Sequence, residues 1–314
     1  MTAPLPAREG IAPSYLWLPE GRWPDLLTFL VQRFPHLGEA VLRERMARGD
    51  LVDEAGRALY PEHPYRQGMR IWYYREVPTE TPIPFEAVVL HRDARLLVVD
   101  KPHFLPMAPA GRFLQETLLI RLRRQLDLPE LTPIHRLDRE TAGVVLFCLD
   151  PASRGAYQSL FERREVSKQY EALARYREDL MLPLLHRSRM EEGKDFFTME
   201  EVAGEPNSET LIELLARRGE LAHYRLSPQT GRKHQLRLHL ASLGIPILND
   251  PFYPVVLADK GDDFSRPLQL LARSIAFRDP YTGGPRQFES SRTLDEPAWQ
   301  TAGEVAVQNS STLP

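Results

Sequence analysis

The chain has 314 residues, of which 42% are hydrophobic and 26% are charged, as is usual for a globular protein. No uninterrupted apolar run approaches the ~20 residues that a membrane helix needs, and the first residues lack the charged start and apolar stretch of a signal peptide. The one cysteine, Cys148, excludes an internal disulfide and a zinc site built from cysteines. We therefore expect a cytoplasmic protein with no membrane partner.

The net charge of −3 counts mildly against nucleic-acid binding, whose usual footprint is a basic domain. The distribution of charge is more informative than its sum. Residues 221–240 contain no acid and carry four basic side chains, Arg225, Arg232, Lys233 and Arg237. Such a segment can hold phosphate even within an acidic protein.

The N-terminal region is predicted to contain an arm followed by helices. Residues 1–22 are rich in Pro and Gly and are expected to form an extended arm. Between Trp23 and Gly49, apolar residues recur at helical spacing and would form two buried faces. The first face contains Leu26, Phe29, Leu30 and Phe34, and the second contains Val41, Leu42 and Met46.

Strands and a linker are predicted next. Residues 49–59 are typical of a short strand, a turn at Gly56 and a return strand, and residues 66–74 of a further strand. The sequence PTETPIP at residues 78–84 is typical of a linker. We therefore place a small α/β domain at residues 23–80 and a larger domain at residues 85–290.

The larger domain mixes hairpins with isolated helices. Residues 86–102 are predicted to form a β-hairpin, and the run VVLFCLD at 144–150 a buried strand. Residues 153–165 are amphipathic and predict a helix, whereas residues 168–176 alternate and predict a strand. This pattern favours an α+β fold with a mainly antiparallel sheet. Residues 291–314 are polar and lack a pattern, so we expect a loose tail.

The densest group of reactive side chains is the loop at residues 135–139, His-Arg-Leu-Asp-Arg, directly before the predicted buried strand. Asp138 is flanked by Arg136 and Arg139, and nearby positive charge favours an ionised carboxylate. An ionised carboxylate at the mouth of a sheet can act as a nucleophile or as a base. The same charges also fit a surface loop with local ion pairs.

A second group lies at residues 226–253. Thr230 and Gly231 predict a helix cap, Leu236, Leu240 and Leu243 make one apolar stripe, and Gly244 and Pro246 end the helix. Arg237 falls beside the stripe, where it can reach inward to a carboxylate. Arg232 and Lys233 at the helix start oppose the helix dipole, so either a bound anion or a solvated basic helix end explains them.

Tyr170 is the last candidate residue, although a tyrosine on a sheet face is more often a core residue.

Metal ligation is not indicated by the histidines. His234 and His239 are five residues apart and do not share a helix face, and His135 has no partner at ligand spacing. The sequence also lacks a Gly-rich phosphate loop. We therefore expect neither a metal nor a cofactor.

These elements, in this order, resemble the RluA-type pseudouridine synthase family. HRLDRETAG at 135–143 is similar to its HRLD-x-x-TSG motif, KQYEAL at 168–173 to its second motif, and TGRKHQLRLHLASLGIPILND at 230–250 to its third. Tyr170 follows Asp138 by 32 residues, the family's usual order of spacing. LLVVDKP at 96–102 is similar to the family's opening strand, and the resemblance covers about two thirds of the chain.

The resemblance implies an enzyme that isomerises a uridine in rRNA or tRNA without a cofactor. Asp138 would be the catalytic carboxylate, Tyr170 would pack against the target base and serve in proton removal, and Arg237 would pair with Asp138. The carboxylate would attack the sugar, attack the base or remove a ribose proton. The target base must leave its stack, and contacts to phosphate, 2′-hydroxyls and loop bases are expected. We assign these to Arg136, Arg232, Lys233 and His234.

Several positions depart from the family pattern. Ala142 stands where serine is usual, Leu271 where a histidine falls, and Asn249 in place of a glycine; the loop after DKP reads PMAPAGRF, where a histidine is frequent. Residues 49–74 faintly resemble a small RNA-binding domain first known from a ribosomal protein. A non-catalytic RNA-binding protein and a metal-dependent phosphoesterase remain alternatives. We expect a monomer that needs no protein partner.

Overall fold

The computed structural model describes residues 3–77, 79–195, 197–257, 261–301 and 304–305. The helices of this part are α1 Leu26–Arg33, α2 Glu39–Ala47, α3 Leu118–Leu126, the 3-10 turn η1 Pro151–Ser153, α4 Arg154–Glu162, α5 Gln235–Ser242 and α6 Pro297–Thr301. The strands are β1 Ser14–Trp17, β2 Leu51–Val52, β3 Arg70–Tyr73, β4 Val88–Arg92, β5 Leu96–Lys101, β6 Thr132–Pro133, β7 Ala142–Cys148, β8 Ser167–Arg175, β9 Leu184–Glu192, β10 Met199–Val202, β11 Ser208–Arg218, β12 Leu221–Pro228, β13 Leu270–Arg278, β14 Pro285–Glu289 and β15 Glu304–Val305. None of these helices combines the length and apolar character that crossing a bilayer requires.

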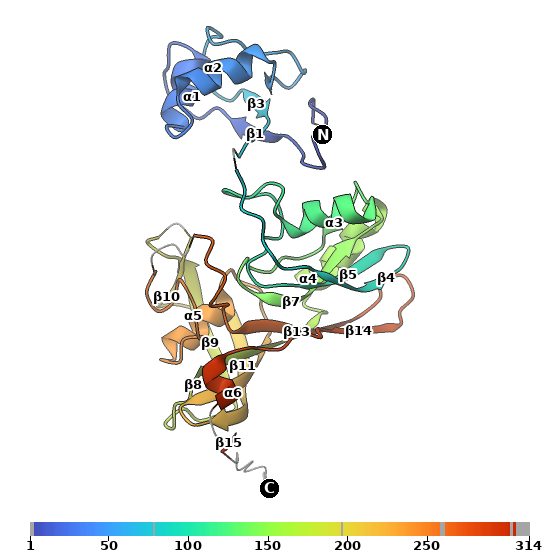
Figure 1. Cartoon of the computed structure of the whole chain (residues 1–314), viewed down its shortest axis with the longest axis vertical. Coiled ribbons are helices and arrows are strands. Elements are labelled where there is room, and N and C mark those ends of the chain that lie inside the picture. The colour runs from blue at the N-terminus through green and yellow to red at the C-terminus, as the bar shows by residue number, and fades with distance from the viewer. Residues whose placement is uncertain (1–2, 78, 196, 258–260, 302–303, 306–314) are drawn as a thin grey trace.

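The N-terminal unit has a core of its own. Its sheet has the order β1-β3-β2, and the helices α1 and α2 pack on one face of it through residues such as Leu30, Met46 and Ile71. Figure 1 shows this unit at one end of the molecule. The prediction of an arm over residues 1–22 is wrong for residues 14–17, which form β1 and pair with β3 in antiparallel register.

The predicted helical segment 23–49 is two helices. Asp25 caps α1, since its carboxylate accepts the N–H of Thr28 at 2.7 Å, and α2 begins after Gly38, whose φ is 73°. Of the second predicted face, Leu42 is buried but Val41 is 38% exposed. The predicted turn at Gly56 is confirmed by its φ of 76°.

The larger sheet has the order β10-β9-β11-β12-β8-β13-β7-β5-β4, with β6, β14 and β15 attached at its sides. Among the described residues only the β7–β13 contact is parallel, so the predicted α+β fold with a mainly antiparallel sheet is confirmed. The predicted hairpin 86–102 is β4–β5, and β7 is buried along its whole length. The predicted helix 153–165 corresponds to α4.

The strand β13 joins the two halves of this sheet, because it pairs with β7 on one side and with β8 on the other. The strands β7 and β13 come very close at Gly143, which has a φ of +114°. A Cβ atom there would lie 2.2 Å from the carbonyl oxygen of Ala272, so only glycine fits. The seam thus makes β13 the strand between β7 and β8 in the sheet, and Figure 1 shows β13 near the middle of the larger unit.

The loose tail expected over residues 291–314 is wrong for its first part. Leu294 and Trp299 are buried in a cluster with Leu173 and Leu271, and β15 pairs with β11. The rest of the predicted tail, residues 302–303 and 306–314, lies outside the described residues. The larger unit therefore extends beyond residue 290 and includes the segment that carries α6.

Candidate active site

The three predicted reactive residues line one pocket of about 420 Å³, which we call the Asp138 pocket. Asp138 lies on the loop before β7, Tyr170 on β8 and Arg237 on α5. The Arg237 Nη1 atom lies 3.4 Å from Asp138 Oδ2, and the Asp138 side chain remains 24% exposed. The pocket volume is within the ~300–1000 Å³ that is common for small-ligand sites.

The Arg237 guanidinium is held in place by Asp250 and by two aromatic rings. Its Nε and Nη2 atoms donate to the two carboxylate oxygens of Asp250 at 2.8 and 2.6 Å, and both side chains are 1% exposed. The rings of Phe252 and Tyr253 lie 4.9 and 5.5 Å from the guanidinium carbon. Burial opposes the charge of Arg237, yet the bond to Asp250 and the charges of Asp250 and Asp138 raise its pKa. The guanidinium is therefore a fixed cation with Nη1 directed at Asp138.

His234 is the second side chain from this segment that lies near the Asp138 carboxylate. Its Nε2 atom is 3.9 Å from Asp138 Oδ2, its Nδ1 atom is 3.1 Å from the Tyr253 hydroxyl, and its ring stacks on Phe252. Burial, together with the charge of Arg237, lowers the pKa of His234 to about 4. At neutral pH this side chain is an uncharged, buried wall of the pocket.

The helix α5 begins later than predicted. His234 itself is the N-cap residue, with a φ of 54°, and the first helical residue is Gln235. The side-chain oxygen Oε1 of Gln235 accepts hydrogen bonds from the Thr230 hydroxyl at 2.7 Å and from the Arg232 backbone N–H at 3.0 Å. The prediction that Thr230 caps the helix is therefore wrong, and Arg232 and Lys233 lie in a turn before the helix, held by Gln235.

The two arginines that flank Asp138 in sequence do not hold it. Arg139 turns away, donating to the carbonyl of Phe104 at 3.1 Å and lying 4.9 Å from the centre of the Phe113 ring. Arg136 is exposed and lines the pocket. The cation closest to Asp138 is Arg237, which comes from a helix 99 residues further along the chain.

Sequence reasoning did not identify the groups that hold the backbone of the Asp138 loop. Lys101 Nζ donates to the carbonyls of Pro102, Leu105 and Arg139 at 2.9, 2.8 and 3.0 Å. Burial lowers the pKa of Lys101 to about 7. His103 Nδ1 lies 2.7 Å from the Glu140 carbonyl oxygen. The DKP motif, seen in the sequence only as part of a signature, thus anchors the residues that follow Asp138.

His135 has a structural role in the same loop. Its Nε2 atom accepts the N–H of Leu146 at 3.1 Å, and its ring stacks on Phe161 at 4.8 Å. Burial, with the charge of Lys168, lowers the pKa of His135 to about 3. Protonation would remove the acceptor that Leu146 uses, so this histidine holds the later part of β7 only in its neutral form.

We predict that His135 makes stability depend on pH. Its pKa is about 3 in the folded chain and ~6.5 when unfolded. The contribution of neutral His135 to the free energy of unfolding is therefore fully present above pH ~6.5. It falls by ~1.4 kcal/mol per pH unit as the pH drops from there toward the pKa of the folded chain. Urea unfolding at pH 7 and pH 5 should show the wild type losing ~2 kcal/mol more than His135→Gln. The exposed His36→Gln is the control, and parallel curves for wild type and His135→Gln would contradict the prediction.

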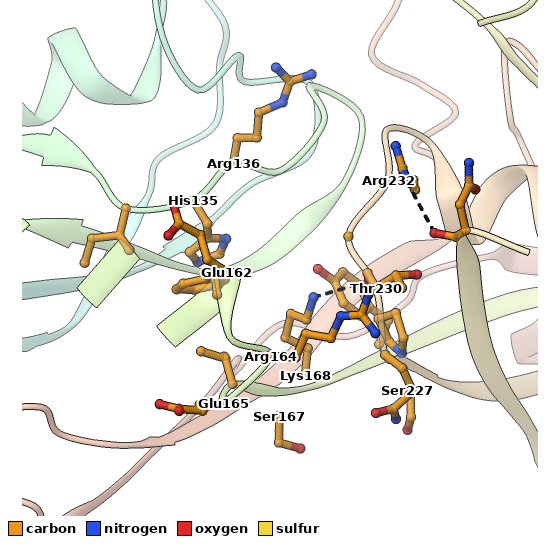
Figure 2. Close-up of a pocket in the computed structure, with 18 of the residues that line it drawn as sticks. His135, Arg136, Glu162, Arg164, Glu165, Ser167, Lys168, Ser227, Thr230 and Arg232 are labelled. Atoms are coloured by element: carbon orange, nitrogen blue, oxygen red, sulfur yellow. Dashed lines mark hydrogen bonds between the residues drawn. The ribbon is translucent and has the colours of Figure 1, made fainter. Parts of the chain in front are cut away.

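A second, larger cavity of about 1070 Å³ adjoins the Asp138 pocket; we call it the outer cleft. The two cavities share the residues Arg136, Lys168, Tyr170, Pro228, Thr230, Gly231 and Arg232. Figure 2 shows Arg136 and Arg232 on separate loops, with Lys168 and Arg164 between and below them. The Nε atom of Arg232 lies 3.4 Å from the Asn207 carbonyl oxygen. Basic side chains thus gather in this cleft although the whole chain is acidic.

Known proteins that are similar to this chain point to one family. Residues 95–242 match the model of the RNA pseudouridylate synthase family. An uncharacterized RNA pseudouridine synthase of Synechocystis is 32% identical over 240 residues, which cover 73% of this chain and 79% of that protein. The dual-specificity RNA pseudouridine synthase RluA of Pasteurella multocida is 34% identical over 209 residues, covering 62% of this chain and 88% of the relative.

The chain belongs to the RluA-type pseudouridine synthase family. It is accordingly an RNA pseudouridine synthase, an isomerase. Human RNA pseudouridylate synthase domain containing 1 shares the fold, with a TM-score of 0.55 at 22% identity over 68% of this chain and 86% of that chain. The resemblance noted in the sequence is confirmed at the level of family and fold.

Two of this synthase's departures from the family pattern are partners in the sheet. Ala142 and Leu271 pair directly across the β7–β13 contact and are both 0% exposed. They replace the usual serine and histidine by an apolar pair, and apolar neighbours surround them. Asn249, where glycine is usual, has a φ of 64°, a conformation that asparagine tolerates.

Proposed function

We propose that the Asp138 carboxylate is the catalytic group and that it acts on a uridine of rRNA or tRNA. The observation that carries this proposal is its place at the mouth of the Asp138 pocket, beside the fixed cation Arg237 at 3.4 Å. Nucleophilic attack and proton removal both need a carboxylate in its ionised form. Attack on the sugar, attack on the base and removal of a ribose proton all use this form.

Arg237 has the role of a positioning residue in this proposal. Asp250 binds two of its nitrogens, and the Phe252 and Tyr253 rings limit its movement. Its remaining nitrogen therefore orients Asp138 without pulling the carboxylate into a bidentate pair. A preorganised site of this kind needs little rearrangement during the reaction.

We propose that Tyr170 packs against the target base. It lines the Asp138 pocket and contacts two hydrophobic clusters from its position on β8. Burial, with the negative charge of Asp138, raises the pKa of its hydroxyl above the ordinary value. The phenol is therefore protonated at neutral pH, which favours packing and hydrogen-bond donation over a role as the resting base.

The outer cleft is proposed to hold RNA next to the target uridine. Arg136, Arg232 and Lys233 are our candidates for phosphate contacts, because all three line the cavities. His234 is buried and uncharged at neutral pH, so it is poorly suited to phosphate. We assign it instead to the wall beside Asp138.

The proposed phosphate contact of Arg232 predicts a change in salt dependence. Counterion release makes the logarithm of affinity fall with the logarithm of salt concentration, by roughly one unit of slope per phosphate. Arg232→Ala should weaken RNA binding and reduce that slope by about one, measured by filter binding at several salt concentrations. Arg175→Ala is the control, since Arg175 is exposed on β8 and lines neither cavity. An unchanged slope for Arg232→Ala would remove this residue from the interface.

The function itself is tested with unmodified transcripts. Full-length rRNA and a set of tRNAs, made by transcription, are incubated with the purified chain, and pseudouridines are then mapped chemically. We expect modification at one or a few uridines in one RNA class, at positions that lose pseudouridine in cells lacking the gene. Transcripts deuterated on the ribose distinguish proton removal from the other two routes, because only proton removal from the ribose gives a primary isotope effect. No new pseudouridine in either RNA class would contradict the proposed substrate.

A further inference from the structure

A second group of reactive side chains lies between the large sheet and α5, outside both cavities. It consists of His186 on β9, Glu201 on β10 and His239 on α5, and one ligand atom of each lies within 4.8 Å of the others. The His186 Nε2 atom is 2.9 Å from Glu201 Oε1, and the rings of His186 and His239 are 4.7 Å apart. Sequence reasoning considered His239 only against a histidine on its own helix, whereas its neighbours come from a preceding hairpin.

Three hydroxyl groups, two of them on buried residues, surround His239. Its Nδ1 atom lies 3.0 Å from Thr210 Oγ1, and its Nε2 atom lies 2.9 Å from Ser208 Oγ and 3.2 Å from Ser188 Oγ. When the Nδ1–H donates to Thr210, the lone pair of Nε2 faces the Ser208 and Ser188 hydroxyls. A hydrogen bond that fixes the far nitrogen in this way is a regular feature of metal-binding histidines.

The cluster can be reached from the solvent through two of its members. The His186 and Glu201 side chains are 17% and 23% exposed, so an ion can enter from the solvent side.

We propose that His186, Glu201 and His239 bind a zinc ion. Two imidazole nitrogens and one carboxylate oxygen are a regular zinc ligand set, and the fourth tetrahedral position is left for water. Within the described residues this is the one group of three or more such side chains that come together. The ion would tie β9, β10 and α5 to one another. It lies apart from Asp138 and takes no part in the isomerisation proposed above.

The test uses untagged, full-length protein freed of metal with a chelator. Titration with Co²⁺ is expected to give one visible d–d spectrum per chain, which one equivalent of Zn²⁺ then abolishes. Zinc is expected to raise the melting temperature, because it binds only the folded form. His186→Ala and Glu201→Gln should each lower the Co²⁺ affinity by at least ~100-fold, and Thr210→Val by ~10–100-fold because it frees the far nitrogen of His239.

His91→Ala is the matched control, since His91 forms a similar contact with Asp93, at 3.1 Å, without a second histidine. This variant should bind Co²⁺ like the wild type. The proposal is overturned if the wild type binds no Co²⁺ at micromolar concentration, or if His186→Ala binds it equally well. It is also overturned if the two ligand variants lower the melting temperature equally with and without zinc, because the cluster would then be a hydrogen-bonded network alone.

Discussion

Replacing Asp138 with asparagine is expected to abolish pseudouridine formation while the chain folds and binds RNA as before. The amide has the same shape as the carboxylate, but it is neither a nucleophile nor a base at neutral pH. We expect a loss of at least ~10²–10⁴-fold, the range seen when a positioned acid–base group is removed. Arg237 keeps its charged partner Asp250 in this variant, so the fold should not suffer from an unpaired buried cation.

Three measurements separate catalysis from binding in this experiment: the single-turnover rate, the RNA dissociation constant and the urea midpoint. Asp127→Asn is the matched control. Asp127 is exposed and has a φ of 52°, a conformation that asparagine also tolerates, and it lies outside both cavities. A rate for Asp138→Asn within tenfold of the wild type would rule out Asp138 as the reacting group.

Asp250→Ala is expected to have the largest effect on stability. This change leaves the guanidinium of Arg237 buried with only the longer contact to Asp138, and removing one partner of a buried ion pair costs ~3–5 kcal/mol. It also removes the acceptor for the backbone N–H groups of Phe252 and Tyr253. Activity should fall as well, because Arg237 no longer has a fixed direction. Urea unfolding gives the stability, and single-turnover kinetics give the rate.

The chain offers a close control for this second prediction. Arg177 and Asp179 form the same bidentate contact, with both distances at 2.7 Å, but on the surface. Asp179→Ala should change stability little, since solvent screens an exposed pair. If Asp250→Ala were as mild as Asp179→Ala, burial would not be what makes the Arg237 contact important.

What the sequence could predict was local or carried by motifs. The hairpin at 86–102, the buried strand at 144–150 and the helix at 153–165 follow from patterns within a few residues of each other. Asp138, Tyr170 and Arg237 were found because their motifs stand in a recognisable order. The structure then brings the three together, with Asp138 and Arg237 in contact at 3.4 Å.

What the sequence could not predict depends on distant pairing. The strand at 14–17 looked like an arm because its partner is β3, more than fifty residues later. The direction of Arg139 depends on Phe104 and Phe113, which come from another segment. Leu294 and Trp299 are buried only because a cluster from β7, β8 and β13 receives them. In each case the deciding neighbour is outside any window that a local pattern covers.

The position of β13 has a consequence for synthesis of the chain on the ribosome. Asp138 belongs to the half of the sheet that contains β4, β5 and β7, and Tyr170 belongs to the half that contains β8 to β12. The strand that seals these halves, Leu270–Arg278, is translated after both of them. A nascent chain that stops before Leu270 has all three motif residues but no seam to align them. Late, non-local pairing of this kind is slow to form. Because the three residues are not aligned without this strand, we expect the nascent enzyme to act on RNA only after most of its sequence has left the ribosome.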